Sequence, residues 1–169
     1  MAFDIRERIA DLPVAQGIKV PFTFALKLAA EVRELRAAVE PDEDLIAAKE
    51  KDLEAQTYYA EIMSVPRGRR EEIYQESLDL YPAKPSFTGG VDEKTQFLRG
   101  NFVRVSIVSA AVIRLIDPSG DVQEENIFEA IKTIHDDAPD QIFEILERRV
   151  GEINKEQDEQ EELAKSTDF

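Results

Sequence analysis

The sequence predicts an all-α protein: a single domain of about seven helices, with a protruding α-hairpin and an acidic C-terminal tail. Three observations lead to this prediction. Apolar residues recur at spacings of three and four through most of the chain, which is the period of one helix face. Clusters of proline, glycine and aspartate interrupt that period at intervals of about one helix length. The chain has 169 residues, of which 43% are hydrophobic, and this suits one globular domain.

The most apolar run, 96–118, is predicted to be the central helix of the core. One face of that helix would carry Phe97, Asn101, Val105, Val108, Val112 and Ile116. Three arginines interrupt the run, so it is too polar to cross a bilayer. The sequence Asp-Pro-Ser-Gly-Asp at 117–121 ends the run, and this combination is typical of a turn.

The first 25 residues contain the only strand-like pattern of the chain. A short helix is expected at 3–12, ended by Pro13. Apolar residues alternate along 18–24, which indicates an extended segment. Pro21 argues against a central strand in this segment. It fits equally well as the first residue of the next helix, where its missing N–H costs nothing.

Two predicted helices at 22–40 and 44–64 are joined by a short acidic link that begins at Pro41. Such a pair predicts an antiparallel α-hairpin over 22–64. The second helix is mostly polar, so we expect the hairpin to protrude from the core. The core itself is expected within 70–153, and the helical domain within 1–153. The predicted core helices are 70–81, 96–117, 123–136 and 139–153.

A basic loop at 65–70 contains the only cluster of positive charge. The cluster consists of Arg67, Arg69 and Arg70. One interpretation is that these arginines neutralise Glu71 and Glu72 at the start of the next helix. The other is that they bind a partner. A phosphate site would need more backbone N–H donors than a loop with one glycine offers.

The longest irregular stretch, 82–95, contains Phe87 between two prolines and a Gly-Gly pair. A loop of this length within a compact domain is often functional. Phe87 either anchors the loop on the core or meets a partner. We therefore take Phe87, together with the three arginines, as the candidate partner-binding residues.

The net charge of −15 is concentrated at the C-terminal end of the chain. Residues 121–169 hold 16 acidic and 5 basic residues, a net charge of −11. Such a surface repels nucleic acid and anionic lipid, so we expect neither as a partner. Segment 154–169 has almost nothing apolar to bury. It is expected to be a disordered acidic tail, with a frayed extension of the preceding helix as the alternative.

The residues offer no catalytic chemistry, so we expect no enzyme, no catalytic residue, no cofactor and no metal. There is no cysteine, and His135 is the single histidine. It lies near the end of a predicted helix, where it complements the helix dipole, and we do not expect it to act as a general base. Neither a glycine-rich nucleotide loop nor a nucleophile elbow is present.

The order of short sequence phrases from about residue 25 to 153 resembles one family. The phrases are Val65-Pro66, Arg70-Glu71-Glu72-Ile73, Leu80-Tyr81-Pro82 with Pro85, Asn101-Phe102, Ala110-Ala111-Val112 and Asp117-Pro118-Ser119-Gly120. Their layout resembles the tail assembly chaperones of long-tailed bacteriophages that infect actinobacteria. The resemblance implies a non-enzymatic role in the host cytoplasm. It also implies two partners, the tape-measure protein and the tail-tube protein.

Two other functions are compatible with the sequence. The acidic C-terminal end suits a helical binding module that mimics nucleic acid and inhibits a basic host protein. A helical enzyme or sensor would need polar groups in the core, and only Asn101, Ser106 and Ser109 supply them there. Self-association into a homo-oligomer stays open for all of these functions.

Overall fold

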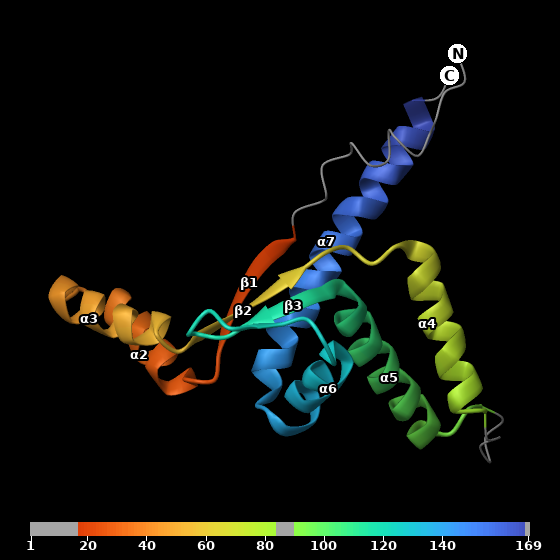
Figure 1. Ribbon diagram of the computed structural model, residues 1–169, viewed down its shortest axis with the longest axis horizontal. Helices are drawn as coiled ribbons and strands as arrows, with labels where there is room; N and C mark the ends of the chain where they lie inside the picture. The colour runs from red at the N-terminus through yellow and green to blue at the C-terminus, as the bar shows by residue number, and fades with distance from the viewer. Residues whose placement is uncertain (1–16, 84–89, 168–169) are drawn as a thin grey trace.

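The computed structural model describes residues 17–83 and 90–167, and in them a small β-sheet accompanies the helices (Figure 1). The prediction of an all-α protein is therefore wrong, although most of the described chain is helical. The elements in order are β1 Ile18–Thr23, α2 Leu26–Arg36, α3 Glu43–Glu54, β2 Thr57–Ile62, α4 Arg67–Leu80, α5 Glu93–Ala111, β3 Val112–Ile116, β4 Val122–Gln123, α6 Ile127–Asp137 and α7 Asp140–Thr167. The helix expected at 3–12 lies outside the described residues.

The four strands form an antiparallel sheet in the order β1-β2-β3-β4. The extended segment predicted at 18–24 is confirmed as β1, whose pairing with β2 runs from Ile18↔Ile62 to Thr23↔Thr57. β1 is an edge strand, which is the position that a strand proline such as Pro21 tolerates. The other edge, β4, has only two residues, so it offers little backbone for pairing with another chain.

Two strands occupy places where the sequence predicted helix. The helix predicted at 44–64 ends at Glu54, and 57–62 is β2. The helix predicted at 96–118 ends at Ala111, and 112–116 is β3. Both strands are rich in aromatic and β-branched residues, which favour a pleated, half-buried position. Pairing between β2 and β3 satisfies their backbone groups and overrides the helical spacing of their apolar residues.

The core lies between one face of the sheet and helices α5, α6 and α7, which contact β3 or β1. The buried cluster consists of Val20, Phe22, Ala60, Ile62, Val65, Val105, Val108, Ala111, Val112, Ile131, Ile134, Ile142, Phe143, Leu146, Val150 and Ile153. The prediction of a core within 70–153 is therefore wrong in part, because β1 and β2 also contribute. Phe97, expected on the buried face of the central helix, is 66% exposed. Tyr74, in the predicted core helix 70–81, is also exposed.

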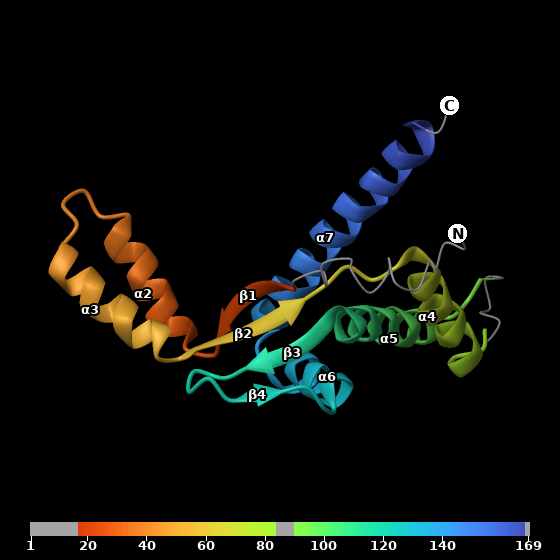
Figure 2. The same cartoon turned by 45° about the horizontal axis from the view of Figure 1, so that its top comes forward.

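The predicted α-hairpin is present and protrudes from the sheet (Figures 1 and 2, orange), but it spans α2 and α3 only. Its bounds are therefore 26–54 and not 22–64. Val32 and Ile46 are its buried residues, one on each helix. Two exposed ion pairs also join the helices: Lys49 with Glu31, and Arg36 with Glu50. These buried residues and ion pairs join the two helices to each other, which explains how the hairpin keeps its structure away from the core.

The acidic C-terminal segment is helical in the structure, so the prediction of a disordered tail from 154 is wrong. α7 is one continuous helix to Thr167. This agrees with the alternative prediction, an extension of the preceding helix. Ile153 and Asn154 are buried, which ties the helix to the domain beyond the predicted boundary. The following residues are mainly glutamate, glutamine, lysine, leucine and alanine, which are strong helix formers.

The turn predicted at 117–121 is confirmed, although it joins β3 to β4 and not two helices. The Oδ1 atom of Asp117 accepts hydrogen bonds from the backbone N–H groups of Ser119 at 2.8 Å and Asp121 at 2.9 Å. Gly120 has a φ of +90°, a conformation that costs residues with a Cβ atom free energy. Glycine is therefore favoured at this corner.

Alanine at two glycine positions is expected to change stability in opposite directions. Gly120→Ala should lower the free energy of unfolding by about 1 kcal/mol, because alanine is strained at positive φ. Gly151→Ala should raise it by about 0.5–1 kcal/mol, because Gly151 lies within α7 and no atom would obstruct the added Cβ. Urea denaturation of both variants measures the difference. Equal changes in the free energy of unfolding of the two variants would contradict the positive φ of Gly120 in this turn.

Candidate functional site

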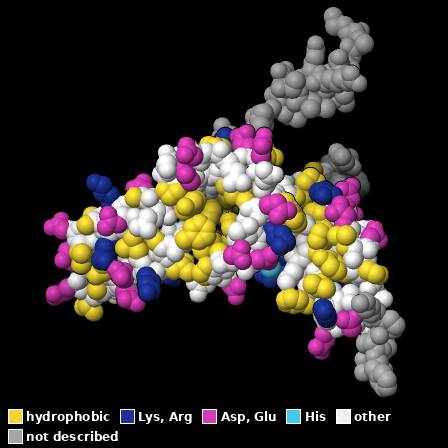
Figure 3. Space-filling view, turned by 60° about the horizontal axis from the view of Figure 1, so that its bottom comes forward, with side chains coloured by type: hydrophobic (Ala, Val, Ile, Leu, Met, Phe, Trp, Pro, Cys, Tyr) yellow, Lys and Arg dark blue, Asp and Glu magenta, His cyan; other side chains and the backbone are white. Residues whose placement is uncertain are grey.

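An open groove of about 600 Å³ lies between the sheet and α6. We call it the α6 groove. Its lining residues are Phe22, Phe24, Tyr58, Leu115, Asp117, Asp121, Val122, Gln123, Asn126, Glu129, Ala130, Thr133 and Ile134. The space-filling view in Figure 3 shows hydrophobic side chains gathered in hollowed parts of one face, with charged side chains of both signs around them. Exposed apolar surface bordered by polar residues is typical of an interaction site.

Three aromatic rings form the apolar part of the α6 groove. Phe22 and Tyr58 are register partners on β1 and β2, and their rings stack with centroids 5.6 Å apart. Phe24 follows β1 and contacts both rings edge-on, at 5.9 Å from Phe22 and 5.2 Å from Tyr58. Each contact of this kind contributes about 0.5–1.5 kcal/mol beyond area burial, so the rings hold one another in place. Phe24 is nevertheless 47% exposed, which leaves apolar surface for a ligand.

All charged side chains that line the α6 groove are acidic. Its charged lining residues are Asp117 and Asp121 of the β3–β4 turn and Glu129 in the first turn of α6, with no lysine or arginine among them. Nearby cations have carboxylate partners elsewhere: Arg114 contacts Glu61 at 2.7 Å, and Lys132 contacts Asp136 at 2.6 Å. The groove therefore has a net negative charge beside an aromatic surface, although Lys132 also interacts with Glu129 and balances part of that charge.

A second groove of about 930 Å³ separates the α-hairpin from α7. Its charged lining residues are Arg33, Arg104, Glu144, Glu147 and Arg148, so both signs are present. Arg104 and Glu147 form a two-point ion pair at 2.6 and 2.7 Å, and the hydrogen bond to Glu147 raises the pKa of Arg104. Because charges of both signs line this groove and Arg104 is paired with Glu147, the groove favours no particular sign of ligand.

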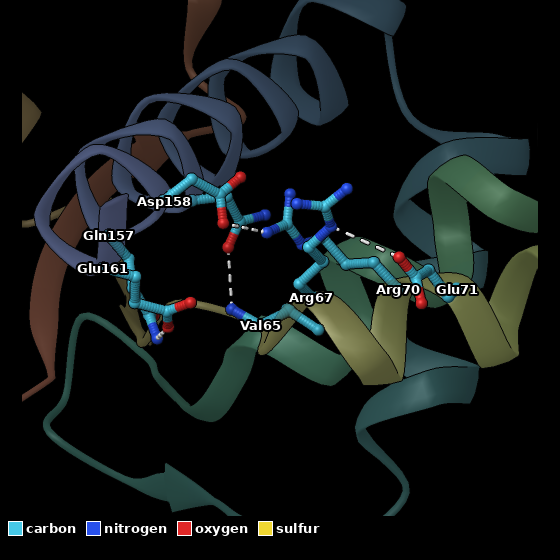
Figure 4. Close-up of polar contacts among 8 residues, drawn as sticks. Val65, Arg67, Arg70, Glu71, Gln157, Asp158 and Glu161 are labelled. Atoms are coloured by element: carbon cyan, nitrogen blue, oxygen red, sulfur yellow. Dashed lines mark hydrogen bonds and ion pairs between the residues drawn. The ribbon is translucent and has the colours of Figure 1, made fainter. Parts of the chain in front are cut away.

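The three candidate arginines lie in the first turn of α4, not in a loop, and each has a carboxylate partner. Figure 4 shows two of them, Arg67 and Arg70. Arg67 pairs with Glu71 at 3.2 Å, and Arg69 pairs with Glu72 at 3.0 Å. Arg69 also contacts Glu76 at 2.8 Å, and these contacts raise its pKa. The interpretation that the arginines neutralise Glu71 and Glu72 is confirmed for Arg67 and Arg69, whereas Arg70 pairs with Asp158. That they bind a partner stays a prediction, and Phe87 lies outside the described residues.

The third arginine belongs to a polar contact that ties α7 to the start of α4. Arg70 pairs with Asp158 at 2.5 Å, across 88 positions of sequence. Close to it in sequence, the buried Oδ1 atom of Asn154 accepts a hydrogen bond from the backbone N–H of Val65 at 2.7 Å. We call these two contacts the α4–α7 clamp. The clamp explains why α7 stays ordered beyond the residues that fill the core.

His135 makes contacts with neighbouring side chains that support a structural role. Its Nδ1 atom lies 2.7 Å from an Asp136 oxygen, and its ring meets the ring of Phe143 edge-on at 4.8 Å. Asp136 has a lowered pKa, mainly because Lys132 donates a hydrogen bond to it and also because of His135. Within residues 17–83 and 90–167, no group of three potential metal ligands converges. None of the helices described there is long and apolar enough to cross a membrane.

Sequence reasoning found only part of the α6 groove. The alternating pattern at 18–24 included Phe22 and Phe24, and the turn at 117–121 included both aspartates. The sequence does not indicate Tyr58 as a groove residue, because its surroundings predict a helix over 44–64. The signal for its strand was the run of β-forming residues at 57–59, Thr-Tyr-Tyr.

The structure defines a class of protein: a mostly helical domain with a four-stranded antiparallel sheet and an aromatic, acidic surface groove. Comparison with protein-family models, with curated proteins and with solved structures gave no match for this chain. The family indicated by the sequence phrases therefore stays a prediction.

Proposed function

We propose that this chain is a non-enzymatic tail assembly chaperone of a long-tailed bacteriophage. In the host cytoplasm it would bind the tape-measure protein and assist assembly of the tail tube. The observation that supports a binding role most directly is the α6 groove, with its exposed aromatic surface beside three carboxylates. The particular clients come from the sequence resemblance over residues 25–153.

The physical argument concerns the solubility of an apolar helical client. A groove that covers apolar side chains of such a helix removes them from water and from contact with other client copies. The net charge of −15 on the chaperone would then keep the complex dispersed through repulsion. A binding role of this kind needs no reactive group and suits a domain whose single histidine packs against Phe143.

Co-expression with the tape-measure protein of the same phage tests this function. We expect the chain to raise the soluble fraction of the tape-measure protein severalfold. Phe24→Ser should remove most of that gain, because it deletes exposed aromatic surface from the α6 groove. Val39→Ser is the matched control, since Val39 is fully exposed at the end of the hairpin.

An unchanged soluble fraction in the presence of the wild-type chain would overturn the proposed function. Both variants are compared with the wild type by thermal unfolding, so that a loss of folding is not taken for a loss of binding. Equal losses with Phe24→Ser and Val39→Ser would show that the α6 groove is not the client site.

A second function, an acidic mimic of nucleic acid that inhibits a basic host protein, is favoured by one observation. The C-terminal half of α7 projects from the domain as a continuous helix (Figure 2). Its exposed carboxylates include Glu156, Glu159, Glu161 and Glu162. Binding of this kind would weaken steeply with salt and would depend on α7, whereas Phe24→Ser would leave it unchanged.

A further inference from the structure

We propose that the α6 groove binds a basic amphipathic helix that lies along α6. Its apolar residues would meet the partly exposed rings of Phe24 and Tyr58, and its lysines or arginines would meet Asp121 and Glu129. The inference rests on the proposed function only for the identity of the natural client. The binding mode itself follows from three features of the groove.

The first feature is the charge of the groove. It holds three carboxylates and no cation, and the whole chain has a net charge of −15. An incoming cation would relieve the repulsion among these carboxylates, whereas an acidic helix would increase it. A second copy of this chain has the same overall charge, so charge complementarity favours a different, basic partner.

The second feature is the face that α6 presents to the groove. Asn126, Glu129, Ala130 and Thr133 follow one another at spacings of three, one and three, so they form one stripe of the helix. Ala130 and Thr133 are small, which allows another helix to approach to the interaxial distance of about 8–10 Å typical of helix packing. The α6 groove therefore accepts a helix more readily than it would if this stripe carried long side chains.

The third feature is Asn126 at the start of α6. It is the only non-glycine residue with positive φ in the described part of the chain, with φ 55° and ψ 33°. Its side chain makes no capping hydrogen bond, although asparagine is a preferred N-cap residue. Backbone strain of this kind is common at binding sites. Asn126 is exposed and lines the groove, so its amide is accessible to a polar group of the bound helix.

The test uses fluorescence anisotropy with the full chain and three labelled peptides of about 18 residues, or five helical turns. The first peptide is an amphipathic helix of leucine, alanine and lysine. The second has glutamate in place of lysine, and the third is a scrambled version of the first. We expect the first to bind at low salt and the second not to bind. The third should bind at least tenfold more weakly.

Two variants locate the binding. Asp121→Asn with Glu129→Gln should raise the Kd of the basic helix about tenfold, since two exposed ion pairs of about 0.5–1 kcal/mol each are lost. Glu156→Gln with Glu162→Gln is the matched control, because it removes the same charge from exposed positions of α7. The control should change the Kd less than twofold.

Three results would overturn the inference: equal effects of the two double variants, equal binding of the acidic helix, or a wild-type dimer that Asp121→Asn with Glu129→Gln converts to a monomer. The last result would make the groove an interface between copies of this chain. Binding of the basic helix without any gain in tape-measure solubility would support the groove and reject the proposed function. A gain in tape-measure solubility without binding of the basic helix would reject the groove as a helix-binding site and leave the proposed function in place.

Discussion

Replacing Leu146 with alanine is expected to lower the free energy of unfolding by about 2–5 kcal/mol, the largest effect that we predict for this chain. Leu146 has no exposed surface and lies in the buried cluster between α7 and the sheet. The shorter side chain would lose apolar burial and leave a cavity that its neighbours fill only in part. Urea denaturation followed by circular dichroism gives the value.

Leu80→Ala is the matched control, because it makes the same chemical change at a residue that is 59% exposed in α4. Its effect should stay within about 0.5 kcal/mol. If Leu146→Ala were as mild as this control, α7 would not pack on the sheet as the structure has it. The comparison therefore tests the central packing contact of the domain.

Asn154→Ala is expected to lower the free energy of unfolding by about 1–3 kcal/mol, because it leaves the buried N–H of Val65 without its acceptor. It should also open the α4–α7 clamp, since Arg70 and Asp158 would then hold the two helices alone. Hydrogen exchange at the Val65 amide should quicken by more than global unfolding explains. This measurement reports on the single hydrogen bond directly.

Lys155→Ala is the control for the clamp. Lys155 is the next residue of α7 and is exposed, with only a 3.8 Å contact to Glu159. Its replacement should change stability by less than about 0.5 kcal/mol and leave exchange at Val65 unchanged. Slow exchange at Val65 in Asn154→Ala would show that the C-terminal part of α7 is not held by this contact.

The candidate site was predictable where it depends on local chemistry. The turn that carries Asp117 and Asp121 follows from proline and glycine at fixed positions, and the strand that carries Phe22 follows from alternation. The groove itself was not predictable. It exists because β1, β2 and the β3–β4 turn meet α6, and residues far apart in sequence, such as Phe22 and Thr133, line one surface.

The sequence by itself determined the helices α2 to α7 approximately, the hairpin, the turn at 117–121 and the concentration of negative charge. These features depend on contacts within a few residues, so periodicity and turn chemistry are sufficient to indicate them. Only the tertiary structure decided that 57–62 and 112–116 are strands. A strand satisfies its backbone groups with a distant partner, and no local pattern distinguishes a short apolar strand from a helix end.

The tertiary structure also decided the state of the acidic segment from 154 onward. Its composition alone suits a disordered tail or a helix. Asn154 and Asp158 reach residues near the start of α4, almost ninety positions earlier in the chain. Those contacts offset the entropy cost of ordering the segment, and they exist only because the fold brings the start of α4 against α7.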